Sequence, residues 1–234
     1  MRASFLTALL IFGVPGAAVA QSSRPVRQPR EVLKAYAVVH RFQSIMAESM
    51  DFDRAFEVTF TKNPKRRREI AIAEGDFGDV DLSRVDSASL ISAFKSRMQI
   101  YFLMLSLLGA ANEEEKALLF PPEIEEILER KPSQLAREFP AFAAQLKRDA
   151  ERFRLHVERL SKERPSVAER IQTFKDEALK RVEPPERIVK PLTAYSRGRV
   201  LGVKEPYYRI GDYAVIREKG EMRIVGIRFF GRLF

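Results

Sequence analysis

Apolar positions that follow residue 30 recur at steps of three and four residues, which is the spacing of one helix face. The stripe through Val32, Val39 and Met46 predicts a first helix. Residues 50–53 interrupt this pattern, and an aspartate there can cap a shorter helix that continues through Phe56. The pattern therefore predicts two consecutive helices at the start of the folded region.

A long apolar helix is predicted over residues 88–111, with Ser87 as its N-cap. Almost every residue after Met98 in this segment is apolar, which is typical of a helix in the centre of a core or in a membrane. Lys95 and Arg97 cut the apolar stretch well below the length that spans a bilayer. We therefore expect a central core helix.

A heptad-like stripe runs from Leu146 to Leu160, and Ser133 can cap the stretch that carries it. Pro165 suits the first turn of another helix, in which Ile171 continues the stripe. Because the connection between these two segments is short, an antiparallel hairpin of helices is expected.

The period of the apolar pattern changes from 3.6 to 2 after a proline-rich linker at residues 184–194. Short runs of Gly, Tyr, Val, Ile and Phe over residues 195–234 predict a small antiparallel sheet of about three strands that packs on the helices. The expected fold class is α+β and predominantly helical, with a bundle-like helical domain at residues 31–183 followed by this sheet.

The turn near Gly220 decides which side chains share a face of the sheet. A two-residue loop would place Glu218 opposite Glu221, an unfavourable pairing of like charges. We therefore expect a three-residue loop with Gly220 as a bulge, so that Arg217 lies opposite Glu221. In this register Arg217 and Arg223 share the solvated face, and Arg223 is free to meet a partner.

The N-terminal residues are predicted to direct export. Residues 1–20 combine one basic residue, a short apolar run and small residues before Ala20, the pattern of a secretory signal peptide. Cleavage after Ala20 leaves a basic tether at residues 21–30, which is expected to be disordered, and no transmembrane segment. A retained N-terminal anchor is the alternative. The expected location is the bacterial periplasm or the medium, where a chain without cysteine must gain its stability from burial.

Charge points to an anionic partner. The full chain carries +9, and the signal peptide holds one of these charges, which leaves +8 after cleavage. The candidate binding residues are Arg209, Arg217, Arg223 and Arg228 in the predicted sheet and Lys65, Arg66, Arg67 and Arg68 in one basic run. The expected partner is an anionic envelope polymer, a membrane surface or a protein client. Export makes nucleic acid an unexpected ligand, and no RNP-like motif is present.

Metal ligands are sparse. His40 and His156 are isolated within predicted helices, so we interpret both as partly exposed helix histidines and not as zinc ligands. Asp76, Asp79 and Asp81 lie in a glycine-containing loop and could hold calcium, although their spacing also suits a solvated loop that caps the next helix. No other metal site and no cofactor are predicted.

No serine-nucleophile, phosphate-loop or zinc-hydrolase motif is present. The leading interpretation is an exported, soluble, non-enzymatic binding protein of the bacterial cell envelope that uses its basic surface. A periplasmic holdase-type chaperone is one alternative. An envelope hydrolase is another, because the fold could bring together two carboxylates that the sequence keeps apart. A deep cleft with two converging buried carboxylates would favour the hydrolase.

Overall fold

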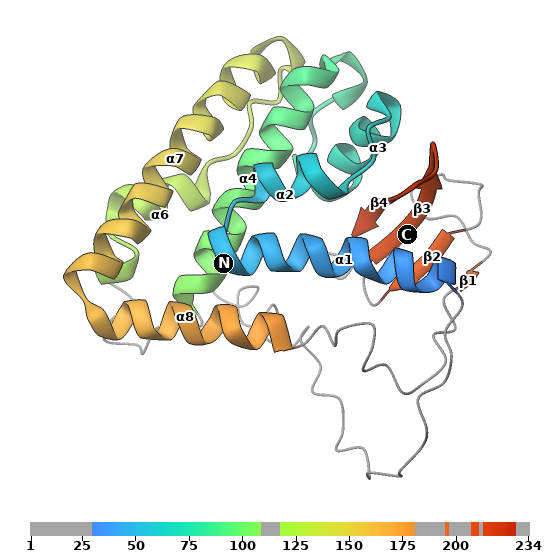
Figure 1. Cartoon of the computed structure of the whole chain (residues 1–234). Coiled ribbons are helices and arrows are strands. Elements are labelled where there is room, and N and C mark those ends of the chain that lie inside the picture. Colours follow the sequence, from blue (N-terminus) through green and yellow to red (C-terminus); the bar gives the residue numbers. More distant parts are fainter. Residues whose placement is uncertain (1–29, 109–117, 181–194, 197–206, 211–212, 228–234) are drawn as a thin grey trace, which may run out of the picture.

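The computed structural model describes residues 30–108, 118–180, 195–196, 207–210 and 213–227. Over these ranges the chain is mostly helical and ends in a small antiparallel sheet, which confirms the predicted α+β, predominantly helical fold class (Figure 1). The predicted signal peptide, the linker at 184–194, Arg228 and all but the last residue of the tether lie outside the described residues.

The helices are α1 (Arg30–Ser49), α2 (Phe52–Thr59), α3 (Pro64–Glu74), α4 (Ser87–Leu108), α6 (Pro122–Glu129), α7 (Phe139–Glu163) and α8 (Pro165–Lys180), with 3-10 turns η2 (Leu82–Arg84) and η3 (Ala136–Glu138). The strands are β1 (Tyr195–Ser196), β2 (Tyr207–Ile210), β3 (Tyr213–Glu218) and β4 (Glu221–Ile227). All neighbouring strands pair antiparallel in the order β1-β2-β3-β4, and β1 contributes only two residues at one edge.

Side-chain caps explain where several helices begin. Asp51 caps α2 as predicted, because its carboxylate accepts a hydrogen bond from the Arg54 amide at 2.9 Å. For α4 the expected cap was wrong by one residue: Asp86 accepts from the Ser89 amide at 2.8 Å, and Ser87 is already helical. The carboxylate precedes the serine in the chain and reaches the third amide of the helix.

The start of α7 differs from the prediction. Ser133 does not cap this helix; its hydroxyl accepts from the Leu135 amide at 3.2 Å and donates to Glu138 in the turn that precedes α7. The helix begins at Phe139, with a proline in its first turn. Pro165 opens α8, as predicted from its fixed backbone angle.

Helix α4 lies at the centre of the helical region, as predicted, in contact with α2, α3, α7 and α8. The apolar stripe of α7 packs mainly on α4, and α7 and α8 meet at an angle, so the expected antiparallel hairpin was wrong (Figure 1). An almost wholly apolar helix offers α7 more apolar area than the half-polar α8 does. Of the helices that the structure describes, none combines the length and apolar character required to cross a membrane.

One hydrophobic core joins the helices to the sheet. The Phe60 ring at the end of α2 lies 4.6 Å from the Phe56 ring and 5.6 Å from that of Phe42 on α1, measured between centroids. Phe42 in turn lies 5.8 Å from Tyr213 on β3. The backbone also bridges the two parts, because the Thr61 amide donates to the Ile224 carbonyl at 2.9 Å beside β4. The segment after α2 therefore extends the sheet at its β4 edge.

The β3–β4 turn is a two-residue loop and not the three-residue loop expected from the sequence. Lys219 and Gly220 form a two-residue loop with φ of 49° and 90°, which places Glu218 opposite Glu221. The like charges are accommodated because each carboxylate has its own donors. Glu218 accepts from the Thr61 hydroxyl at 2.8 Å and from the Lys62 amide at 2.9 Å, while Glu221 pairs with Arg223.

Side chains alternate along a strand, so this one-residue difference in register moves each side chain of β4 to the other face relative to the side chains of β3. Arg217 lies opposite Met222, and Ile216 lies opposite Arg223, so the two arginines are on opposite faces of the hairpin. The face toward the helices carries Val215, Met222, Ile224 and Ile227. A second small cluster of Tyr207, Ala214, Ile216 and Val225 occupies the other face.

Candidate binding cleft

A cleft of about 1050 Å³ lies among α2, α4, α7 and α8. Residues of α4 that recur at three- and four-residue steps line it, among them Ala88, Ser92, Ser96 and Gln99. Helix α7 lines the opposite side with Lys147, Ala150, Arg154 and Val157. The cleft therefore follows much of the length of both helices, which run side by side (Figure 1).

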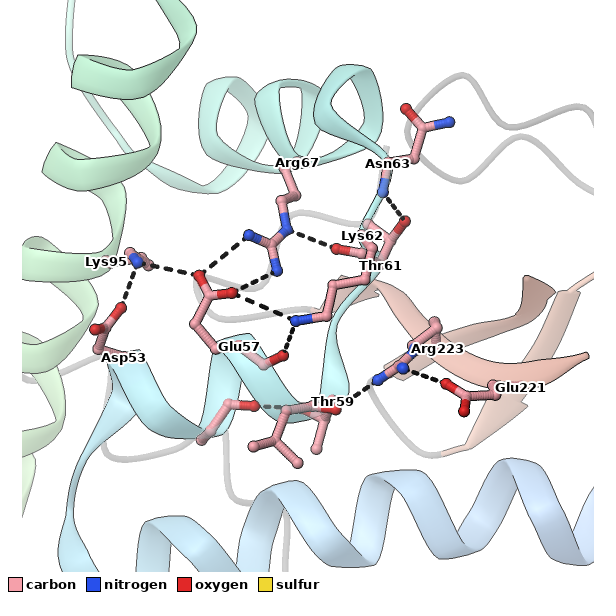
Figure 2. A network of polar contacts seen from close by, with 12 residues as sticks. Asp53, Glu57, Thr59, Thr61, Lys62, Asn63, Arg67, Lys95, Glu221 and Arg223 are labelled. Carbon is pink, nitrogen blue, oxygen red and sulfur yellow. Dashed lines mark hydrogen bonds and ion pairs between the residues drawn. The ribbon is translucent and has the colours of Figure 1, made fainter. Parts of the chain in front are cut away.

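The α2 side of the cleft holds a network of ion pairs centred on Glu57 (Figure 2). Two nitrogens of the Arg67 guanidinium donate to the two carboxylate oxygens at 3.1 and 2.9 Å. The Lys95 ammonium group donates to the same carboxylate at 3.2 Å and also pairs with Asp53. Lys62 approaches the other oxygen at 3.4 Å. The charges of Asp53 and Glu57 are thus matched by nearby cations.

These contacts change the acidity of Glu57. Burial alone would raise its pKa, but the hydrogen bonds and charges of Arg67 and Lys95 outweigh burial and lower the pKa to about 2. Arg67 is itself fixed in three ways: it also donates from Nε to the Thr61 carbonyl at 2.6 Å and lies over the Phe56 ring, 5.0 Å from its centroid. Glu57 is therefore a charged structural partner at neutral pH.

On the α7 side, Arg154 lies between two carboxylates one turn away in each direction and pairs with both Glu151 and Glu158. The hydrogen bond from Arg154 lowers the pKa of Glu151. The carboxylates of this side are consequently occupied by an arginine of their own helix.

Three lysines of the cleft remain without such a partner. Lys147 and Lys162 on α7 and Lys175 on α8 line the cleft and make no ion pair or hydrogen bond with any residue in the part of the chain that the structure describes. Because the neighbouring carboxylates are engaged by other cations, these three charges are available to a ligand.

The carboxylates of the cleft do not fit the acid required for glycoside hydrolysis. A general acid needs a raised pKa, whereas the pKa values of Glu57 and Glu151 are both lowered by their basic partners. Their side chains are also 41% and 55% exposed. The fold has thus not paired buried carboxylates among the described residues that line this cleft.

The basic run at residues 65–68 does not form one surface. It lies in the first turns of α3, where consecutive side chains point in different directions around the helix. Lys65 is exposed and Arg66 is half-buried. Arg67 belongs to the Glu57 network, and Arg68 donates to the Val85 carbonyl at 2.7 Å. Two of these four candidates are therefore used to hold the fold together.

The sheet arginines are also separated. Arg223 is not free: its side chain is 18% exposed, and it donates to the Val58 carbonyl at 2.6 Å and pairs with Glu221. Arg217 is exposed and lies 3.9 Å from Glu31 of α1. Arg209 is exposed on β2. The expected basic face of the hairpin was wrong, because it rested on the three-residue loop.

The calcium candidate is not assembled. Among the described residues no three His, Cys, Asp or Glu side chains converge as metal ligands, so Asp76, Asp79 and Asp81 do not form a site. Asp81 instead caps the η2 turn, where its carboxylate accepts from the Ser83 amide at 3.2 Å. The Asp76 carbonyl accepts from Arg97 at 2.6 Å. The loop is held by backbone contacts and a cap.

The two histidines have different environments. His40 is half-buried on α1, as predicted, with Nδ1 3.4 Å from the Ser44 hydroxyl. His156 was expected to be partly exposed but is buried, and its Nε2 lies 2.9 Å from the Leu119 carbonyl. A carbonyl only accepts, so Nε2 donates, and neutral Nδ1 accepts from Arg159 at 3.2 Å. His156 thus ties α7 to the segment before α6.

The cleft could not be predicted from the sequence, because α2, α4 and the consecutive helices α7 and α8, which build it, come from separate parts of the chain. One trace of it is visible in the sequence: Ser92, Lys95, Ser96 and Gln99 place polar and small side chains on one face of an otherwise apolar helix. No protein-family model, curated protein or solved structure matches the chain. Its function is therefore inferred from the geometry of the cleft.

Proposed function

We propose that the protein is an exported, non-enzymatic binding protein of the bacterial cell envelope, and that it holds an anionic partner at the cleft between α4 and α7. The observation that carries the proposal is the set of three unpaired lysines, Lys147, Lys162 and Lys175, in a cleft whose carboxylates pair with other cations or, at Asp51, cap α2. The signal-peptide pattern of residues 1–20 supports export.

The arrangement favours an elongated partner over a single small anion. Lys147 and Lys162 are fifteen residues apart on α7, which separates their positions by about 22 Å along the helix axis. Lys175 extends the basic wall onto α8 beyond the end of α7. Each exposed charge contributes little alone, so affinity requires a ligand that reaches several of them.

The first test removes the three lysines together. The mature protein is isolated from a bacterial host, its N-terminus is determined by mass spectrometry and is expected at Gln21, and its elution by salt from immobilised polyglutamate is measured. The variant Lys147→Gln, Lys162→Gln, Lys175→Gln should bind about tenfold more weakly, because three exposed contacts contribute about 0.5 kcal/mol each.

The matched control removes the same charge elsewhere, with Lys65→Gln, Lys131→Gln and Lys219→Asn, three exposed positions that do not line the cleft. This variant should keep most of the retention. Equal weakening of both variants would assign binding to the overall charge of the protein and would exclude the cleft as its site.

A further inference from the structure

We propose that the natural occupant of the cleft is an amphipathic helix of a protein partner, with acidic residues at both ends of its apolar stripe. This inference deepens the proposed function and rests on it, since it assigns a ligand class to the same cleft. Four features carry it: the helical character of the described residues that line the cleft, the apolar base of the cleft, its size and the placement of the unpaired lysines.

The lining decides the backbone conformation of the occupant. Every residue of the lining within the described part of the chain belongs to a helix or to the short turn between α1 and α2. Helices use their own backbone groups internally, so the cleft offers an extended peptide no strand edge with which to pair. A bound strand would leave its buried N–H and C=O groups without partners, whereas a helix satisfies its own.

The floor suits the apolar side of such a helix. The base of the cleft is apolar: Ile91 is half-buried there, and the largely buried side chains of Met50, Leu103, Val157 and Ile171 lie beneath it. Small residues between them allow a close approach, and these are Ala88, Ser92, Ser96 and Ala150. The hydroxyls of two other lining serines do not compete for the ligand, because Ser106 and Ser161 donate to carbonyls of their own helices at 2.7 and 2.9 Å.

The size is also appropriate. A helix about 10 Å across and about 20 Å long occupies roughly 1600 Å³ as a cylinder. A cleft of about 1050 Å³ is smaller than such a helix and would leave one face of it in water. Such partial burial is the usual geometry of an amphipathic helix in a hydrophobic groove.

The charges fix where the acidic residues of the partner lie. Lys147 lies at one end of the stretch of α7 that lines the cleft, and Lys162 lies at the other, in the last turn of α7. Lys175 lines the cleft from the second half of α8. Between these ends Arg154 is already paired with two glutamates. Among the described residues, Lys147 and Lys162 therefore place unpaired positive charge at the two ends of the stretch of α7 that lines the cleft, and the matching partner has acidic residues about four helical turns apart.

The test uses three synthetic 18-residue helical peptides. The first has a leucine stripe with glutamates in its first and last turns. The second has the same stripe with lysines at both ends, and the third keeps the glutamates but has serines in the stripe. Isothermal titration of the mature protein should show at least tenfold tighter binding of the first peptide than of either control. Equal affinities for the three peptides would overturn the inference.

Two protein variants locate the binding. Ser92→Trp fills the floor at a half-buried position, and Ala88→Trp does so at an exposed position of the same stripe in case the first fails to fold. Either tryptophan substitution, in a variant whose circular dichroism matches that of the wild type, should abolish binding of the first peptide and preserve retention on polyglutamate. Undiminished peptide binding in a folded tryptophan variant would show that the peptide helix binds outside the cleft.

The two proposals fail in different ways. If retention on polyglutamate depends on the three lysines but no peptide binds, only the helix proposal is wrong. If retention does not depend on these lysines, the proposed function is wrong as well, whatever the peptides do.

Discussion

Glu57 shows how a single residue redirects the basic charge of this protein from binding to structure. Its carboxylate gathers Arg67, Lys95 and Lys62 from three different segments, so these cations are not available to a ligand. The consequence for stability depends on pH. The folded pKa of Glu57 is about 2, below its ordinary value of 4.5, so the ionised form is favoured by folding.

The sign of the effect follows from this lowered pKa. The contribution of Glu57 is fully present above about pH 4.5 and is lost as the pH falls toward 2. We expect Glu57→Gln to lower the free energy of unfolding by about 1 kcal/mol at pH 7, a modest value because the side chain is 41% exposed. The difference from wild type should shrink toward zero near pH 2, measured by urea unfolding.

Glu48→Gln serves as the control for this measurement, since Glu48 is exposed at the end of α1. It should change stability little at either pH. A difference between wild type and Glu57→Gln that is the same at pH 7 and pH 2 would contradict the structural role assigned to the ionised carboxylate.

At the scale of elements, the β3–β4 turn makes the sharpest prediction. Lys219 has a positive φ of 49°, a conformation that asparagine tolerates better than lysine. Lys219→Asn should therefore stabilise the protein by about 0.5 kcal/mol, a fraction of the left-handed penalty. Gly220→Ala should destabilise it by about 1 to 2 kcal/mol through its φ of 90°, since no atom lies within 4 Å of the added Cβ.

Thermal unfolding of the two variants distinguishes the two-residue loop from the three-residue loop. The three-residue loop expected from the sequence needs a left-handed residue only at Gly220, so in that loop Lys219→Asn would bring no gain. A gain at residue 219 together with a loss at residue 220 supports the two-residue loop, and a loss at both positions would contradict it.

The same turn shows what sequence patterns reveal and what they miss. Apolar spacing was sufficient to predict α1, α4 and a sheet of about three strands, to which the structure adds the two-residue β1, because burial of one face is a local property of each segment. The register was missed because Glu218 is relieved of repulsion by Thr61, a residue 157 positions away. The cleft was missed for a related reason: its walls come from separate helices, and no local pattern indicates which lysines will lack partners.

At the scale of the whole molecule, the helices and the sheet share one core. Ile224 of β4 is fully buried in the same cluster as Phe42 and Phe60, and its carbonyl accepts the Thr61 amide. The sheet should therefore not unfold as a separate unit. A domain that unfolds independently would need a core of its own, and the cluster on the other face of the sheet contains only four of the described residues.

Ile224→Ala tests this coupling. Loss of a fully buried isoleucine should lower stability by about 2 to 4 kcal/mol. Helical circular dichroism at 222 nm and tyrosine fluorescence, to which the strands contribute four of the six tyrosines, should shift together to lower temperature. Ile72→Ala makes the same chemical change at a position that is 43% exposed on α3 and should have a much smaller effect. If the helical signal of Ile224→Ala kept the wild-type midpoint while the tyrosine signal shifted, the sheet would be an independent unit.

Binding at the cleft would then be insensitive to the sheet. If the two signals shift together, damage to the hairpin should also weaken the cleft, because α2 lines the cleft and its Val58 carbonyl accepts from Arg223 of the hairpin.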